Sequence, residues 1–225
     1  MIIQARNLTK KFTSGEVETI AIHDINLAVP KGEFLTITGR SGSGKSTLLY
    51  QLGLLDHPTS GEVYIEDRPM SKLSGEERTD LRLRELGYVF QDYAIIPSLT
   101  ALENVALPLL AQGLNRLRAF HKAQVALEKV GLGHRLNNLP GQLSGGEQQR
   151  VSIARAIGHE PKIIFADEPT ANLDSETSQV VLKAFLDLNR EGQTIIMVTH
   201  EEDYAALAHR RVILSDGKIV EERKG

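Results

Sequence analysis

The sequence predicts an α/β protein in which a helical segment is inserted between two parts of a sheet. Short apolar runs typical of buried strands alternate with helical patterns up to residue 91 and again after Pro161. A glycine-rich loop directly follows one of these strands and precedes a helix. Between about residues 92 and 158 the apolar residues recur with helical spacing, and no alternating β-branched run interrupts them.

The first part of the chain reads as strands joined by turns and two helices. Residues 18–29 end in the alternating apolar residues Ile25, Leu27 and Val29, which favours a half-buried strand. A Pro-Lys-Gly turn then leads to a buried strand over Phe34–Thr38 and the glycine-rich loop. The elements predicted next are a helix at 46–55, a strand at 61–66, a helix from Ser74 to about Arg84 and a strand at 86–90.

The sheet pattern resumes at Ile163 and continues to the last residues. The predicted strands are 163–166, 194–199, 211–214 and 218–221, and the predicted helices are 175–190 and 201–208. Asp216-Gly217 is typical of a hairpin turn between the last two strands. We expect one compact domain over residues 1–225, with a core at about 1–91 and 159–225 and a helical subdomain at about 92–158.

Composition excludes several classes of protein. The 26 basic and 29 acidic residues give a net charge of −3, so the chain lacks the basic surface typical of nucleic-acid binders. There is no cysteine, which excludes disulfides and thiolate metal sites. The first residues lack the apolar stretch of a signal peptide, and no apolar run reaches the ~20 residues that span a bilayer. Action at a membrane therefore requires a partner.

The glycine-rich loop predicts a site for a nucleoside triphosphate. Glycines let the backbone N–H groups surround phosphate oxygens, and the helix that follows adds its positive end. We expect Lys45 to reach the β- and γ-phosphates and Ser46 to bind Mg²⁺. The alternative, a turn with a solvated lysine, is disfavoured by the strand before the loop and the helix after it. The predicted phosphate-binding residues are Gly39, Arg40, Ser41, Gly42, Ser43, Gly44, Lys45, Ser46 and Thr47.

Two carboxylates follow the buried strand at 163–166. Ligands bind at the carboxyl ends of strands in open α/β sheets, which favours a role for Asp167 and Glu168. We expect Asp167 to hold Mg²⁺ through water and Glu168 to orient or deprotonate the attacking water. Asp-Glu-Pro is also an ordinary way for a strand to end. The phosphate loop earlier in the chain makes the catalytic interpretation the stronger one.

A third motif, Leu143-Ser-Gly-Gly-Glu147, lies between the other two. With these motifs in order, the chain resembles, over essentially its full length, the nucleotide-binding subunit of an ATP-binding cassette (ABC) transporter. The resemblance implies a RecA-like P-loop NTPase core, an antiparallel β subdomain and an inserted α-helical subdomain. It also implies that Phe12 stacks on adenine, Gln91 contacts Mg²⁺ and His200 senses the γ-phosphate. Without the resemblance, Phe12 reads as a core residue and His200 as a structural one.

The resemblance further implies a site shared between two copies. Ser144, Gly145, Gly146 and Glu147 match the signature that contacts ATP bound to the other copy, and Asp174 matches a loop that crosses the dimer interface. ATP would then join two chains head to tail, and Lys45, Glu168 and His200 would perform hydrolysis. A membrane permease would dock on the helical subdomain, which implies a peripheral position on the cytoplasmic face of the membrane.

Residues 53–61 and 99–109 most resemble the lipoprotein-releasing, macrolide-exporting and peptide-antibiotic-resistance ATPases, with cell-division relatives nearby. Two other interpretations stay open. A regulatory ATPase of a cell-division type would transmit a signal without transport. A soluble ABC ATPase of nucleic-acid metabolism or translation usually has a long coiled-coil insertion or two cassettes, neither of which is seen here. The sequence does not identify the substrate, the direction of transport, the permease, or whether the dimer is homomeric.

Overall fold

The structure, a computed structural model, describes residues 1–15 and 17–224; Glu16 and Gly225, which belong to the expected domain, lie outside it. The chain divides into two compact units, each of which is described by itself. The first unit consists of Met1–Asp80 and Gly192–Gly225, and the second consists of Leu81–Glu191. The single domain with a helical subdomain at about 92–158 stays a prediction.

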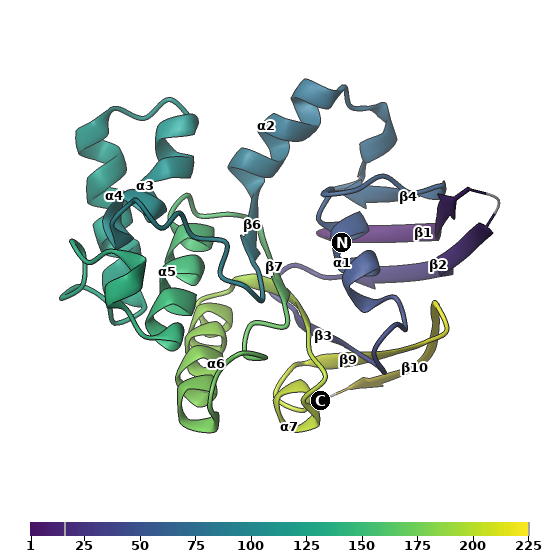
Figure 1. Cartoon of the computed structure of the whole chain (residues 1–225). Coiled ribbons are helices and arrows are strands. Elements are labelled where there is room, and N and C mark those ends of the chain that lie inside the picture. Colours follow the sequence, from purple (N-terminus) through teal and green to yellow (C-terminus); the bar gives the residue numbers. More distant parts are fainter. Residues whose placement is uncertain (16, 225) are drawn as a thin grey trace. The chain divides into compact units, whose positions relative to one another are not determined.

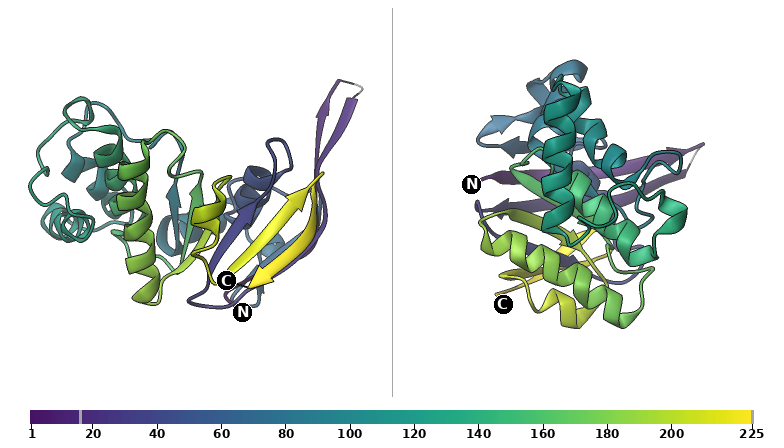
Figure 2. Two further views of the ribbon diagram at one scale, coloured as in Figure 1. Left: turned by 90° about the horizontal axis from the view of Figure 1, so that it is seen from below. Right: turned by 90° about the vertical axis from the view of Figure 1, so that its left-hand side faces the viewer.

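Unit 1 contains an antiparallel sheet with the strand order β2-β1-β4-β5. These strands are β1 (Ile3–Ser14), β2 (Val17–Val29), β4 (Ser60–Ile65) and β5 (Arg68–Pro69), and the short helix η1 (Met70–Lys72) follows. Figure 2 shows β1 and β2 as a long two-stranded ribbon. The sequence did not predict β1, because its register shifts twice between Ala5 and Lys10 and so breaks the alternation that marks a strand.

Unit 1 also contains the strands that carry the phosphate loop, in the order β10-β9-β3-β8. β3 (Phe34–Thr38) runs parallel to β8 (Thr194–Val198) and β9 (Arg210–Ser215), and β10 (Lys218–Lys224) pairs antiparallel with β9. Every residue of β3 and β8 is buried, as expected for strands covered on both faces. Figure 1 shows α1 (Lys45–Leu52) continuing from the loop after β3.

Two predicted helices of unit 1 are shorter than expected. The helix expected at 46–55 ends at Leu52, because Gly53 caps it and Leu54 has a left-handed φ of 59°. The helix expected at 201–208 is only the four-residue α7 (Glu202–Ala205). The predicted start at Ser74 is confirmed, since Ser74 and Glu77 exchange the two hydrogen bonds of a capping box before α2 (Gly75–Glu85).

Unit 2 pairs two parallel strands with a group of helices, coloured teal to green in Figure 1. The strands are β6 (Leu86–Val89) and β7 (Ile163–Asp167). The helices are α3 (Ala101–Ala111), α4 (Arg116–Lys129), η2 (Pro140–Gln142), α5 (Gly145–Ile157) and α6 (Ser175–Arg190). Each of the four α-helices begins after a polar cap whose side chain accepts a backbone N–H; the caps are Thr100, Asn115, Ser144 and Asp174.

A buried asparagine organises the loop before α3. Asn104 accepts a hydrogen bond from the N–H of Ile96 (2.7 Å) and donates to the carbonyls of Ile96, Leu99 and Thr100 at 3.0–3.1 Å. Its side chain replaces the backbone partners that an irregular segment lacks. Among the residues that the structure describes, no helix has the length and apolar character needed to cross a membrane.

Candidate functional site

The phosphate loop of unit 1 folds so closely against its neighbours that side chains are excluded from two of its positions. Gly39 and Gly44 both have positive φ, 147° and 98°. A Cβ atom added to either glycine would lie less than 3.0 Å from a backbone oxygen, that of Leu214 for Gly39 and that of Ala21 for Gly44. Glycine is required at both positions, because any side chain would push the loop away from β9 or β2.

Lys45 is the first residue of α1, and its side chain reaches back to this loop. Its side chain is 8% exposed, and its ammonium group donates to the carbonyls of Gly39 (3.0 Å) and Arg40 (3.1 Å). The buried hydroxyl of Ser43 has no hydrogen-bond partner among the described residues. Buried polar groups normally have hydrogen-bond partners, so the Ser43 hydroxyl is a group that a bound ligand can pair with. Ser46 and Thr47 follow in the first turn of α1.

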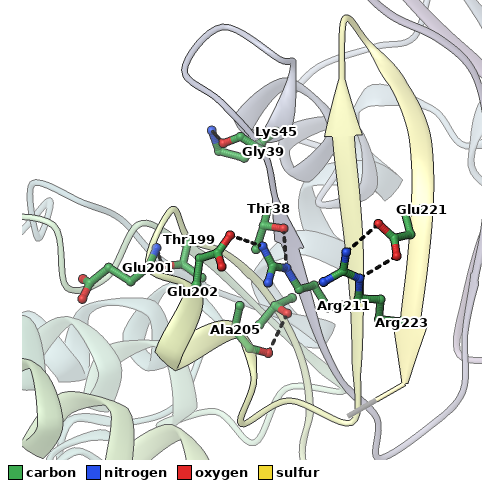
Figure 3. Close-up of polar contacts among 11 residues, drawn as sticks. Thr38, Gly39, Lys45, Thr199, Glu201, Glu202, Ala205, Arg211, Glu221 and Arg223 are labelled. Atoms are coloured by element: carbon green, nitrogen blue, oxygen red, sulfur yellow. Dashed lines mark hydrogen bonds and ion pairs between the residues drawn. The ribbon is translucent and has the colours of Figure 1, made fainter.

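A cavity of about 1000 Å³ opens beside the loop. Its walls include residues 39–43, His200, Arg211 and residues 213–216, so unit 1 brings the predicted histidine to the predicted phosphate loop. Arg211 fixes one wall by donating to the hydroxyl of Thr38 (2.8 Å) and to Glu202 (3.0 Å), as Figure 3 shows. Thr38 is the residue before Gly39, so these bonds also brace the start of the loop.

Phe12 is the half-exposed aromatic residue of β1, with 48% of its surface accessible. The ammonium of Lys10 lies 5.0 Å from its ring centroid and is itself held by the carboxylate of Asp56 and the carbonyl of His57. A ring with a cation on it and an accessible surface can stack on a flat ligand. Its exposure means that Phe12 is no core residue of this unit.

The remaining predicted residues belong to unit 2. Asp167 ends β7 and is only 6% exposed, and Glu168 follows with a left-handed φ of 46°. Gln91 is exposed after β6, and the side-chain amide of Asn172 donates to its carbonyl (3.1 Å). A left-handed, non-glycine residue is uncommon and is often found at functional sites.

The signature residues form the start of α5. Ser144 caps the helix by accepting from the N–H of Glu147 (3.2 Å), and Glu147 accepts from the N–H of Ser144 (2.9 Å). Glu147 also pairs with Arg135 (2.9 Å). The N–H of Ser144 contributes most to holding the pKa of the Glu147 carboxyl below its usual value. These contacts of Glu147 therefore stabilise the helix start, while the backbone N–H groups at the start of α5 can face a ligand.

The two signature glycines are packing positions as well. A Cβ atom added to Gly145 would lie 2.9 Å from the hydroxyl of Tyr93, and one added to Gly146 would overlap Cγ2 of Thr177. Asp174, the cap of α6, accepts from the N–H of Thr177 (2.9 Å), and this bond holds the pKa of the Asp174 carboxyl below its usual value. The predicted signature and the predicted interface loop thus meet inside unit 2.

Sequence reasoning missed two polar residues on the buried side of α5. The amide of Gln149, fully buried, donates to the carbonyls of Pro169 (2.8 Å) and Phe90 (3.4 Å). Arg155 donates to the carbonyls of Tyr93 (3.1 Å) and Ala94. The helical spacing of the apolar residues could have indicated Gln149, because it assigns this residue to an otherwise apolar buried surface.

Comparison with known proteins gives a consistent result. A family model described as "ABC transporter" matches residues 22–171. An uncharacterized ABC transporter ATP-binding protein of Methanocaldococcus jannaschii is 50% identical over 98% of both chains. The lipoprotein-releasing system ATP-binding protein LolD of Aquifex aeolicus is 48% identical over 98% of this chain and 97% of its own.

A solved structure is similar over nearly the whole chain. It is a dimeric, post-hydrolysis state of the ATP-binding cassette MJ0796 bound to ADP and Pi, with a TM-score of 0.91 and 41% identity. The match covers 99% of this chain and 98% of the other. The similarity confirms the predicted α/β fold of the P-loop NTPase type.

The two loop glycines Gly44 and Gly42 provide a matched test of the packing described above. Both have positive φ, but a Cβ atom at Gly42 would meet nothing within 4 Å. Gly42→Ala should destabilise the protein only by the left-handed strain of about 1–2 kcal/mol. Gly44→Ala should cost about 1–3 kcal/mol more, because it also overpacks the loop against Ala21. Urea unfolding of both variants measures the difference, and equal losses would contradict the packing argument.

Proposed function

Because this chain belongs to the ABC transporter family and is an ATP-binding ATPase of that family, we propose that it drives a separate membrane permease of the lipoprotein-release or macrolide-export type. The observation that carries the proposal is the buried Lys45, held by loop carbonyls that a triphosphate can replace. The 48% identity with a lipoprotein-releasing relative supports the choice of type. The proposed reaction of the site converts ATP and water to ADP and phosphate.

ATP would bind first to unit 1. Phe12 would stack on the adenine, and the backbone N–H groups of residues 39–47 would receive the phosphates. Lys45 would exchange its bonds to the Gly39 and Arg40 carbonyls for bonds to the β- and γ-phosphate oxygens. Phosphate oxygens carry negative charge, so these bonds join two charged groups and are stronger than the bonds to neutral carbonyls that they replace. The hydroxyl of Ser43 would gain a partner in the same step.

The oxygen donors of the site fit Mg²⁺. Among the described residues no group of three or more His, Cys, Asp or Glu side chains could hold a metal ion. Mg²⁺ characteristically keeps several waters and binds through one or two carboxylates plus substrate phosphates. Ser46, Gln91 and Asp167 would supply the protein oxygens, and the bound ion would neutralise charge on the phosphates.

Hydrolysis would depend on two further groups. Glu168 would orient or deprotonate the attacking water, and the left-handed backbone at this residue fixes where its side chain begins. His200 would contact the γ-phosphate from the wall of the cavity beside the phosphate loop. Loss of the γ-phosphate would remove that contact, which makes His200 the sensor of the nucleotide state.

Each site would be completed by a second copy of the chain arranged head to tail. Ser144, Gly145 and Gly146 would present the positive end of α5 to the γ-phosphate bound by the other copy, with Glu147 holding that helix start. Asp174 would lie at the same interface. ATP would thus join the two copies, and hydrolysis would remove the charge that joins them.

The permease would dock on the helical subdomain, for which we propose the boundaries 92–158, inserted into a core of residues 1–91 and 159–225. Hydrogen bonds of Asn104 fix the backbone conformation of the loop before α3, and Ile96 in that loop is 38% exposed. An apolar loop with a fixed backbone suits a short helix of the permease. This arrangement would place the chain at the cytoplasmic face of the membrane.

Crosslinking tests the docking proposal. A photo-crosslinker placed at positions 92–104 of the assembled complex should label the permease, because these positions lie in the proposed docking loop and in the start of α3. Positions on the exposed side of β10, such as Val220, serve as the control. Labelling from the control positions alone would contradict the proposal, and the captured membrane protein would show whether the complex transports or signals.

The shared site predicts that activity depends on protein concentration. ATPase activity per subunit should rise steeply with concentration, because every site needs signature residues from another copy. Mixing two inactive variants, Lys45→Ala and Ser144→Arg, should restore activity, since one of the two sites in a mixed dimer is intact. ATPase activity per subunit that stays constant on dilution, together with no recovery on mixing, would contradict the shared-site proposal.

Glu168→Gln tests the assignment of the catalytic carboxylate. The substitution keeps the shape of the side chain and removes its charge, so ATP should still bind while hydrolysis falls by roughly 10²-fold or more. The dimer held by ATP should then accumulate on size exclusion in Mg-ATP. Lys45→Ala is the control that should lose phosphate binding and stay monomeric. A Glu168→Gln protein with near-normal turnover would show that another group handles the water.

A further inference from the structure

Thr177, in the first turn of α6, touches two motifs of unit 2 at once. Its methyl carbon Cγ2 occupies the space that a side chain at Gly146 would need. Its hydroxyl donates to Oδ2 of Asp174 (2.8 Å), and its N–H donates to Oδ1 of the same carboxylate (2.9 Å). Both branches of the Thr177 side chain therefore make a contact. The methyl packs against the signature turn, and the hydroxyl bonds to the cap of α6.

The two contacts are linked by one torsion angle. The hydroxyl and the methyl of threonine share Cβ, and β-branching leaves few staggered positions for χ1. If the methyl turns away from Gly146, the hydroxyl leaves Asp174. If the hydroxyl turns away from Asp174, the methyl moves within the space beside Gly146. A rotation that frees one contact thus disturbs the other.

We propose that Thr177 is a positioning residue that sets the signature turn at Ser144–Gly146 in register with the loop that ends at Asp174. The inference rests on the proposed function, in which both of these segments meet the same second copy. Two segments that must fit one partner bind it better when their relative position is set beforehand, because less ordering is needed on association. Thr177 itself needs no contact with the nucleotide or with the second copy.

Neighbouring contacts agree with this role. Ser144 and Glu147 already fix the start of α5 by their capping box, and Asp174 fixes the start of α6. What these caps do not determine is the position of one helix start relative to the other. Within unit 2, Thr177 contacts the first turns of both α5 and α6. It can reach α5 because Gly146 has no side chain.

The test uses the Glu168→Gln background, in which an ATP-held dimer can be counted. The quantity measured is the ATP concentration that gives half-maximal dimer by size exclusion with light scattering. Thr177→Val keeps the methyl and removes the hydroxyl, so this concentration should rise roughly 2- to 10-fold. Binding of fluorescent ATP to the dilute monomer should change less than roughly 2-fold, since the monomer would bind ATP through residues 39–47 and not through the signature that Thr177 contacts.

A second experiment tests whether a smaller side chain at position 177 relieves a steric clash at position 146. Gly146→Ala should raise the half-maximal ATP concentration roughly 10-fold or more, because the new methyl displaces Thr177. Thr177→Ser removes Cγ2 and keeps the hydroxyl, so the double variant should return to within roughly 3-fold of Thr177→Ser alone. Simple additivity of the two single effects, with no rescue, would overturn the inference.

Two controls separate this role from a general loss of structure and from a failure of the proposed function. Thr79→Val removes a comparable hydroxyl, which donates to the carbonyl of Gly75 (2.9 Å) at an exposed position of α2, and should leave dimer formation unchanged. Dimer loss in Thr177→Val that merely follows a fall in its thermal unfolding midpoint would overturn the inference. A Glu168→Gln parent that never dimerises overturns the proposed function and this inference with it. A parent that dimerises, with both Thr177 variants unaffected, overturns the inference alone.

Discussion

The site depends on backbone approaches that leave no room for a Cβ atom. At Gly39 and Gly44 the phosphate loop lies against backbone oxygens of β9 and β2, and at Gly146 the start of α5 lies against Thr177. Such contacts hold a loop by its main chain, and close packing leaves the main chain little room to shift. The backbone N–H groups are therefore aimed before a ligand arrives, and the binding free energy need not be used to order them.

Polar side chains complete this arrangement by holding the helix starts. Ser144 and Asp174 both accept N–H groups of their own helices, so their oxygens are used to shape the backbone. In unit 1 the phosphate loop is held by Lys45, whose ammonium donates to two carbonyls of the loop. The difference has a physical reason, because a bound phosphate can replace a carbonyl as a partner for a cation, whereas the cap of a helix must stay in place in every nucleotide state.

Local patterns predicted most of the elements, and long-range contacts account for what was missed. The helix at 175–190 and the buried strand at 34–38 were confirmed with their bounds, since a capped amphipathic stretch and a short apolar run are local signals. Strand β1 was missed because its bulges break the alternation. The chemistry of Lys45 and Glu168 could be read from motifs, and these roles stay predictions. The role of Thr177 could not be read, because it comes from a contact with Gly146, 31 residues earlier in the chain.

Helix α5 links the loops of unit 2 that surround the predicted catalytic residues. Its first turn is the signature, and further along it Gln149 bonds to the carbonyl before Gln91 and to the carbonyl after Glu168. Arg155 holds the two left-handed residues that follow in the same loop, Tyr93 and Ala94. Breaking these bonds would leave a buried glutamine amide unpaired, at a cost of about 1–3 kcal/mol, and would also release the half-buried guanidinium of Arg155. A displacement of α5 must therefore carry the loop at 90–94 and the residues after β7 with it, which gives the signature a rigid connection to the proposed chemistry.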